Sequence, residues 1–151
     1  MKGVSLFVPI AALVLSVELA AAESSTMATR FGKLSIAGES YQNQLLVNGK
    51  RILEGQQLSF VKKFSLADSD VVLINDNSGG NSCPSGSFFF VTLKSGNVLV
   101  TPKFGTCYED EPTVVQKDGR IYFSMTRLGG KGRATFVYSN GSMSENGKVL
   151  K

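Results

Sequence analysis

Along most of this chain, short runs of β-branched and aromatic residues alternate with turn-forming residues, which is the pattern of β-strands joined by tight turns. No segment keeps a helical hydrophobic period over several turns. The pattern therefore predicts an all-β protein with little helix. The expected strands are Phe31 to Ile36, Tyr41 to Val47, Arg51 to Leu53, Leu58 to Phe64, Val71 to Asn75, Phe88 to Leu93, Val98 to Thr101, Thr113 to Gln116, Arg120 to Thr126, Ala134 to Tyr138 and Gly147 to Leu150.

Glycine recurs as the second residue of turn-forming pairs between these runs. The pairs are Asn48-Gly49, Ser95-Gly96, Asp118-Gly119, Asn140-Gly141 and Asn146-Gly147. Glycine adopts positive φ without a steric clash and Asn or Asp tolerates it, so these pairs favour tight hairpins. Repeated hairpins predict a single antiparallel meander. Such a meander forms either a small barrel or a sandwich, and the sequence leaves both open.

The first residues have the pattern of a secretory signal. Lys2 precedes a largely apolar run from Val4 to Val17, and Ala20-Ala21-Ala22 offers the small side chains that signal peptidase accepts. The run is shorter than the roughly 20 apolar residues of a membrane-spanning helix. We therefore expect cleavage after Ala22 and a flexible leader, rich in Ser and Thr, over residues 23–30, followed by a single β domain over residues 31–151. The predicted location is periplasmic or secreted, with no stable membrane insertion after cleavage.

The chain has two cysteines, Cys83 and Cys107, and an exported protein meets an oxidising environment in which two such thiols favour a disulfide. A bridge closing a loop of this length stabilises a small domain by about 3 kcal/mol in the chain-entropy model. The loop before Cys83 is rich in Gly and Asn, and an ordered loop loses less entropy when a partner docks. The candidate binding residues are Asn77, Gly79, Gly80, Asn81, Pro84, Phe104 and Tyr108. A disulfide that only stabilises the fold, without any role in binding, would explain the same features.

The run Phe88-Phe89-Phe90-Val91 places bulky apolar residues on both faces of one strand. Either the strand is central and covered on both sides, or one ring face forms an exposed patch that binds a partner. Because phenylalanine is found mainly in cores, the buried interpretation is favoured.

Charge and composition exclude several classes of function. There are 16 Lys and Arg against 12 Asp and Glu, a net charge of +4, and the bases are scattered, so a nucleic acid partner is not expected. The chain has no histidine, which excludes Ser-His-Asp and Cys-His catalysis and histidine zinc sites. No catalytic residue, metal or cofactor is predicted. Carboxylates in Glu109-Asp110-Glu111 and at Asp68, Asp70 and Asp76 remain available for acid–base chemistry.

Several short motifs resemble a pattern found in an uncharacterised family of small exported bacterial proteins. They are Gly79-Gly80-Asn81-x-Cys83-Pro84, Pro102-x-Phe104-Gly105-Thr106-Cys107 and Tyr138-Ser139-Asn140-Gly141. The resemblance implies a bacterial envelope location and a disulfide between Cys83 and Cys107. It implies no activity.

Together these features favour an exported, non-enzymatic binding or inhibitor-type module that presents disulfide-stapled loops to an envelope protein or glycan. One alternative is an envelope hydrolase that uses carboxylates. A second alternative is a structural envelope protein that self-associates through an open sheet edge.

Overall fold

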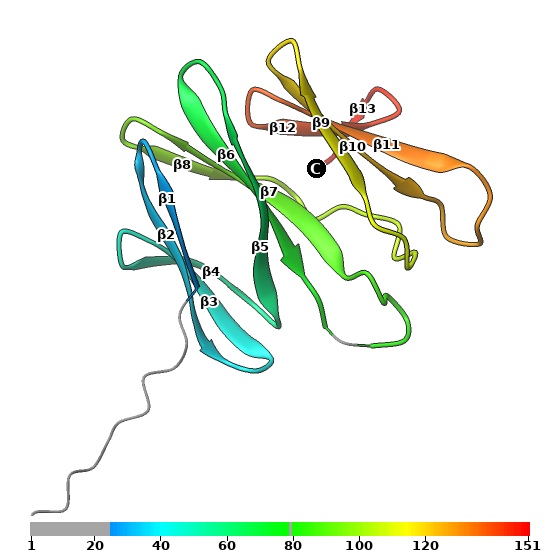
Figure 1. The fold of residues 1–151 in the computed structure, drawn as a ribbon, viewed down its shortest axis with the longest axis horizontal. Coiled ribbons are helices and arrows are strands. Elements are labelled where there is room, and N and C mark those ends of the chain that lie inside the picture. The colour runs from blue at the N-terminus through cyan, green and yellow to red at the C-terminus, as the bar shows by residue number, and fades with distance from the viewer. Residues whose placement is uncertain (1–24, 79) are drawn as a thin grey trace, which may run out of the picture.

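The computed structural model describes residues 25–78 and 80–151, and the regular structure in this part of the chain is entirely β (Figure 1). The N-terminal sheet, in order, contains β1 (Ser25–Thr29), β2 (Gly32–Glu39), β3 (Gln42–Val47) and β4 (Lys50–Gly55). The central sheet contains β5 (Leu58–Ser65), β6 (Ser69–Asp76), β7 (Ser87–Lys94) and β8 (Asn97–Val100). The C-terminal sheet contains β9 (Thr113–Lys117), β10 (Arg120–Thr126), β11 (Arg133–Ser139), β12 (Ser142–Glu145) and β13 (Lys148–Val149).

Each sheet is an antiparallel run of consecutive strands, so the predicted all-β hairpin chain is confirmed. Of the two arrangements left open, the structure has the sandwich type, with three sheets packed in layers rather than one closed barrel (Figure 1). Strand β12 was not among the expected strands, because its Ser-Met-Ser-Glu sequence carries one large apolar residue. The predicted signal segment, residues 1–22, lies outside the described residues.

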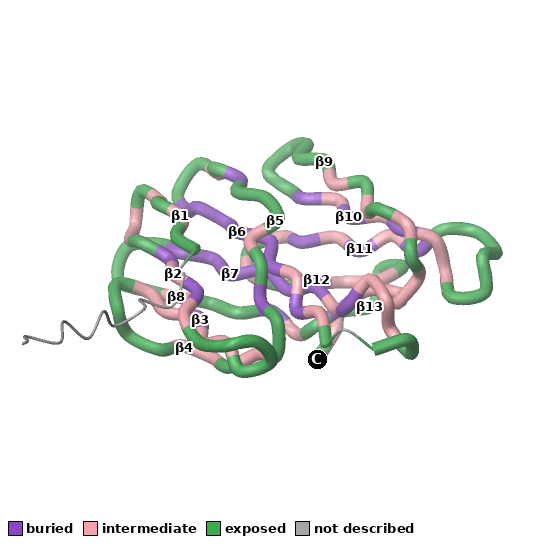
Figure 2. Tube along the Cα trace, turned by 60° about the horizontal axis from the view of Figure 1, so that its bottom comes forward, coloured by how far each residue is buried: buried purple, intermediate pink, exposed green. Residues whose placement is uncertain are grey.

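The two middle strands of the central sheet, β6 and β7, are buried on both faces, which explains their unbroken apolar sequences (Figure 2). Along β7, Phe88 and Phe90 face the C-terminal sheet, whereas Phe89 and Val91 face the N-terminal sheet. The neighbouring β6 alternates in the same way. The buried interpretation of the phenylalanine run is therefore confirmed.

Two separate cores result, one on each side of the central sheet. The core toward the N-terminal sheet is largely aliphatic and includes Leu34, Leu45 and Ile74. The core toward the C-terminal sheet is aromatic, and its members include Phe90, Phe104, Phe123, Phe136 and Tyr138. The ring centroids of Phe90 and Phe104 are 5.5 Å apart, and the Phe104 ring stands edge-on to Phe123 at 5.0 Å. Phe104 thus joins the central and C-terminal sheets.

Within the segment expected to be a flexible leader, residues 25–29 form β1, which pairs along its whole length with β2. A composition rich in Ser and Thr is compatible with an edge strand as well as with a flexible leader. Composition alone therefore did not predict that this segment pairs with β2. Arg30, directly after β1, donates from its backbone N to Asp70 Oδ2 (2.7 Å) and from Nε to Asp70 Oδ1 (2.9 Å). Its guanidinium also donates to the carbonyls of Leu66 and Ser69. This cluster ties the N-terminal sheet to the central sheet.

We expect Arg30→Ala to destabilise the fold, because the Asp70 carboxylate is only 1% exposed and would lose its cation. The expected cost is about 2 kcal/mol, less than for a fully buried pair because Arg30 is itself half-exposed. Urea unfolding measures the difference. Arg51→Ala, which removes an exposed ion pair with Glu54, is the control and should cost little. Equal effects of the two substitutions would contradict the role given to Arg30.

Candidate functional site

A polar groove lies where the β2–β3 hairpin and β4 meet the base of the loop between β6 and β7, residues 77–86, which contains Cys83 and which we call the disulfide loop. Its cavity volume is about 730 Å³. Side-chain amides are prominent in its lining, so we call it the amide groove. It is lined by Tyr41, Gln42, Asn43, Gln44, Glu54, Gly55, Gln56, Asp76, Ser78, Cys83, Gly86, Ser87 and Lys103.

Tyr41 stands at the mouth of this groove in an unfavourable backbone conformation. It is the second residue of the two-residue turn between β2 and β3, and its φ is 68°. In the other hairpins, the non-glycine residues with positive φ are Asn or Asp, which tolerate this region: Asn48, Asp118, Asn140 and Asn146. The Tyr41 side chain is 58% exposed, so core packing does not account for its presence. Backbone strain at an exposed aromatic residue beside a groove points to binding.

The hairpin that carries Tyr41 is rigidly placed. Asn43 donates from Nδ2 to the Glu39 carbonyl (2.9 Å) and accepts the Leu58 N–H at Oδ1 (2.8 Å). Opposite it, Gly38 has a φ of 118°, and a Cβ there would lie 2.2 Å from the Gln42 carbonyl oxygen. Only glycine fits at that close approach. The groove wall is therefore formed before any ligand arrives.

Three glutamines of the groove are available to a ligand. The side chains of Gln42, Gln44 and Gln56 make no hydrogen bond to other parts of the described chain. Each amide offers two donor hydrogens and an acceptor oxygen. Together with the exposed ring of Tyr41, they form a surface that combines hydrogen bonding with one flat apolar face.

Asp76 and Lys103 form the floor of the groove. Asp76 Oδ2 accepts a hydrogen bond from Lys103 Nζ at 2.6 Å, and Oδ1 accepts the backbone N–H groups of Gln56 (2.9 Å) and Gln57 (3.2 Å). Burial is the largest single influence on the pKa of Asp76 and raises it, but these three bonds together outweigh burial and lower the pKa below 3.8. Asp76 is thus a fixed anion that holds the β4–β5 turn against β6.

The disulfide between Cys83 and Cys107 is present, with the two Cα atoms 4.3 Å apart. The disulfide loop is also anchored at its base by hydrogen bonds. Asn75 Nδ2 donates to the Ser85 carbonyl (2.8 Å), and Asn77 Nδ2 donates to the Pro84 carbonyl (3.2 Å). The disulfide loop therefore has a defined base, and one of its two cysteines, Cys83, lines the amide groove.

The residues predicted to bind a partner separate into different places. Asn81, Pro84 and Tyr108 line a second hollow at the disulfide loop, together with Leu128 and Gly129. Gly80 is exposed, and Asn77 is half-buried and holds the loop. Gly79 lies outside the described residues.

Phe104 does not reach the surface. It is only 6% exposed and belongs to the aromatic core, where its backbone also pairs with Phe88. The sequence interpretation of Phe104 as a ligand-facing residue is therefore corrected: its position beside the disulfide comes from its role in the core.

Sequence reasoning missed Tyr41, Gln42, Gln44, Gln56 and Lys103. Two signals were present: the amide-rich stretches Gln42-Asn43-Gln44 and Gln56-Gln57, and a tyrosine in a turn position that normally holds Gly, Asn or Asp. Neither signal indicated that these residues face the disulfide loop.

The aspartates considered for acid–base chemistry are held as anions. A hydrogen bond from Lys94 is the main cause that lowers the pKa of Asp68, and a hydrogen bond from the Thr126 hydroxyl is the main cause that lowers the pKa of Asp110. Burial raises the pKa of Asp70, but the bonds from Arg30 outweigh it. A glycosidase acid needs a raised pKa, which these groups lack.

Neither a metal-ligating cluster nor a membrane-spanning helix occurs in residues 25–78 and 80–151. There, no three His, Cys, Asp or Glu residues gather in a way that could hold a metal ion. Over the same residues, no helix is long and apolar enough to cross a membrane.

The fold and the groove define a three-layer all-β domain with a disulfide-closed loop. The chain belongs to the Y4bG N-terminal domain family, whose model matches residues 31–148. No curated protein and no solved structure matches the chain. Whether the GGNxCP and PxFGTC motifs mark an exported family stays a prediction.

We expect the double substitution Cys83→Ser with Cys107→Ser to lower the free energy of unfolding by about 3 kcal/mol, because the unfolded chain regains the entropy of an open loop. The measurement is urea unfolding without reductant. Adding reductant to the unsubstituted protein is the control and should produce the same loss. A double variant as stable as the parent would contradict the stabilising role of the disulfide.

Asp76 also makes stability depend on pH. Its folded-state pKa is lowered from 3.8, so its contribution is complete above that value and is lost as pH falls through the folded-state pKa. We expect Asp76→Asn to have a lower free energy of unfolding than the parent at pH 7. Below about pH 4 this difference between variant and parent should become smaller. Unfolding free energies measured from pH 7 to acid test this. Glu39→Gln, at an exposed carboxylate without an ion pair in the described chain, is the control. A stability difference between Asp76→Asn and the parent that stays constant with pH would contradict a lowered pKa of Asp76 in the folded state.

Proposed function

We propose that this chain is an exported, non-enzymatic binding module and that its amide groove holds an uncharged glycan of the bacterial envelope. The observation that carries the proposal is Tyr41, an exposed tyrosine kept at positive φ beside three glutamines without internal hydrogen bonds. Sugars present alternating hydroxyl groups and flat apolar C–H faces. Amide side chains complement the hydroxyl groups, and an aromatic ring complements the C–H face.

The charges around the groove favour a neutral ligand over an acidic one. Asp76 is paired with Lys103, and Glu54 is paired with Arg51 at 2.6 Å. These pairs leave no excess cation to attract a carboxylate or phosphate. A groove that is polar but locally neutral suits recognition through hydrogen bonds and stacking.

The fixed state of Asp76 supports binding rather than hydrolysis. A glycosidase places a carboxylic acid and a second free carboxylate on opposite sides of the sugar. Here the buried carboxylate of the groove already accepts three hydrogen bonds and stays ionised, so it has no proton to donate at neutral pH.

The disulfide is consistent with an oxidising, exported location, because disulfides form and persist in the periplasm and outside the cell. The signal-like pattern of residues 1–22 supports the same assignment. An envelope glycan is a ligand that a periplasmic or secreted protein meets.

Tyr41→Asn separates function from stability. Asn tolerates positive φ, so this variant should gain about 1 kcal/mol of stability from relief of strain. It should also lose the stacking ring and bind an uncharged oligosaccharide at least about tenfold more weakly. Calorimetric titration and thermal unfolding measure the two effects.

The ligand for this titration comes from a screen of neutral and uronic-acid oligosaccharides against the parent protein. Tyr122→Ala, on the outer face of the C-terminal sheet, is the matched control and should leave affinity unchanged. A parent protein that retains no oligosaccharide would overturn the proposal. So would a Tyr41→Asn variant that binds as well as the parent.

A further inference from the structure

The loop between β10 and β11 is an ordered projection that carries an exposed leucine. Arg127 N donates to the Gly132 carbonyl (3.0 Å) and Gly130 N donates to the Arg127 carbonyl (2.9 Å), so the loop is closed. Gly130 also packs against the Tyr108 side chain. Leu128 is 71% exposed, and the loop extends to the far edge of the molecule in Figure 1. We call residues 127–132 the leucine loop.

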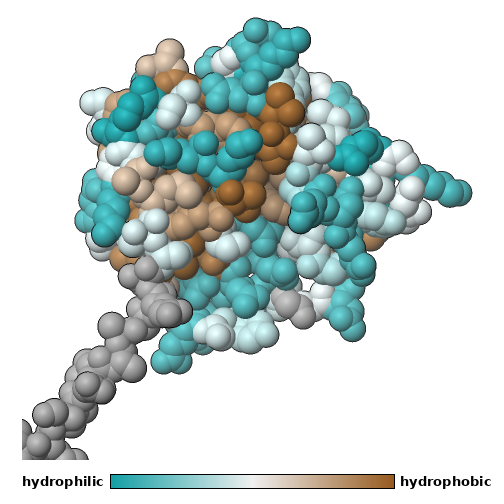
Figure 3. Space-filling model, viewed as in Figure 1, coloured by the Kyte–Doolittle hydropathy of each residue, from teal (hydrophilic) through white to brown (hydrophobic). Residues whose placement is uncertain are grey.

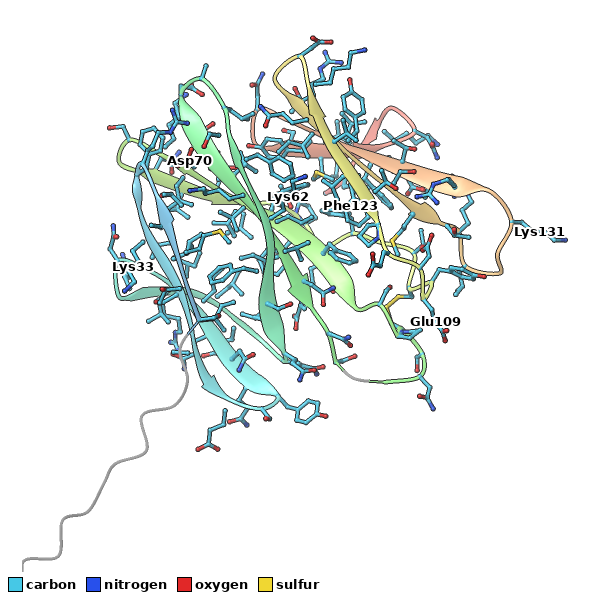
Figure 4. All side chains as sticks on the ribbon, viewed as in Figure 1. Lys33, Lys62, Asp70, Glu109, Phe123 and Lys131 are labelled. Atoms are coloured by element: carbon cyan, nitrogen blue, oxygen red, sulfur yellow. A yellow bond between two sulfur atoms is a disulfide. The ribbon has the colours of Figure 1, made fainter. Side chains whose placement is uncertain are left out.

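The leucine loop presents one free cation. Arg127 is paired with Glu145 and neighbouring Arg133 with Asp110, each at 3.5 Å. Lys131 has no carboxylate partner in the described chain, and its side chain points away from the body of the molecule (Figure 4). The loop thus offers an apolar side chain beside a single unpaired ammonium group.

A hollow of complementary character lies between the central sheet and the connection into β9. Val61, Phe88, Pro112 and Val114 supply apolar walls, and Lys62, Glu109 and Glu111 lie beside them; its cavity volume is about 490 Å³. Val61 sits at a bulge in β5, where it is not paired with β6, and its side chain is exposed. Figure 3 shows apolar surface in the middle of this face. We call this site the β5 hollow.

The β5 hollow is also where unpaired carboxylates and apolar side chains occur together. Neither Glu109 nor Glu111 forms an ion pair with the described residues, although Asp68, Asp70, Asp76 and Asp110 all do. Docking an apolar side chain there together with an ammonium group would bury apolar area and neutralise the local charge.

We propose that the occupant of the β5 hollow is the leucine loop of a second copy of this chain, with Leu128 in the hollow and Lys131 at Glu109 and Glu111. The charge of the loop complements that of the hollow, where the unpaired carboxylates of Glu109 and Glu111 outnumber the one cation, Lys62. The second hollow, which Leu128 lines, shares Glu109 and Asp110 with the β5 hollow, so the two surfaces adjoin. Adjoining surfaces permit two copies to exchange loops about a two-fold axis, which closes the assembly as a dimer.

A membrane is a weaker candidate for the leucine loop. One apolar side chain and one unpaired cation fall short of the two signals that stable membrane anchoring requires. Pairing through an open sheet edge, the self-association considered from the sequence, would need neither Leu128 nor the glutamates.

The test measures the mass of the full exported protein by analytical ultracentrifugation from about 1 µM to about 1 mM. The parent should pass from monomer to dimer over this range. Leu128→Asp should raise the dissociation constant at least about tenfold. Leu99→Asp is the matched control and should dimerise like the parent, because Leu99 is 42% exposed and lies on β8, at the opposite edge of the central sheet from β5 and beside the β11–β12 turn.

Charge reversal tests the partner assignment. Glu109→Lys with Glu111→Lys should block self-association, and mixing this variant with Lys131→Glu should restore a mixed dimer. A parent that stays monomeric at all concentrations would overturn the proposal, as would dimers insensitive to Leu128→Asp. Leu128-dependent flotation with anionic phospholipid vesicles, without dimerisation, would also overturn it and assign the loop to membranes. The dimerisation test contains no glycan, so a negative result would not bear on glycan binding in the amide groove.

Discussion

The burial of the central sheet on both faces is the constraint on which the rest of the structure depends. Strands β6 and β7 carry apolar side chains on both sides, so this sheet needs a cover on each face to stay out of water. The N-terminal sheet supplies an aliphatic cover and the C-terminal sheet an aromatic one. The two outer sheets therefore need only one apolar face each, and their outer faces remain free to carry polar side chains (Figure 2).

The amide groove follows from this layering. Its walls come from the end of the N-terminal sheet and from the loop that leaves the central sheet after β6, and Asp76 joins them through its bonds to the β4–β5 turn. Lys103 reaches the same floor from the connection between the central and C-terminal sheets. Segments distant in the sequence meet because the sheets are stacked. The disulfide and the ion pair between buried Asp76 and exposed Lys103 then limit how far these segments can separate.

Local patterns in the sequence predicted the fold class well, and contacts between sheets account for what they missed. The alternation of apolar residues and the Asn-Gly and Asp-Gly turns predicted most strands, and the Phe88–Phe90 run predicted a doubly covered strand. Strand β1 was missed because an edge strand needs little apolar content when its neighbour supplies the hydrogen bonds. Tyr41 and Gln56 were missed because they line one groove with Cys83 only after the sheets have packed together. Phe104 was misplaced because proximity to a cysteine in sequence does not distinguish a core residue from an exposed one.

Because each sheet is built from consecutive strands, the order of synthesis has a consequence for folding. Hairpins between neighbouring strands form quickly and locally, so each sheet can assemble from its own stretch of chain. The N-terminal sheet emerges first, but its apolar face has no cover until β6 and β7 arrive, and the central sheet in turn waits for β10 and β11. Stacking, rather than strand pairing, is then the slow and cooperative event. A chain that stops before residue 113 exposes the aromatic face of its central sheet, the form of this protein most prone to aggregate.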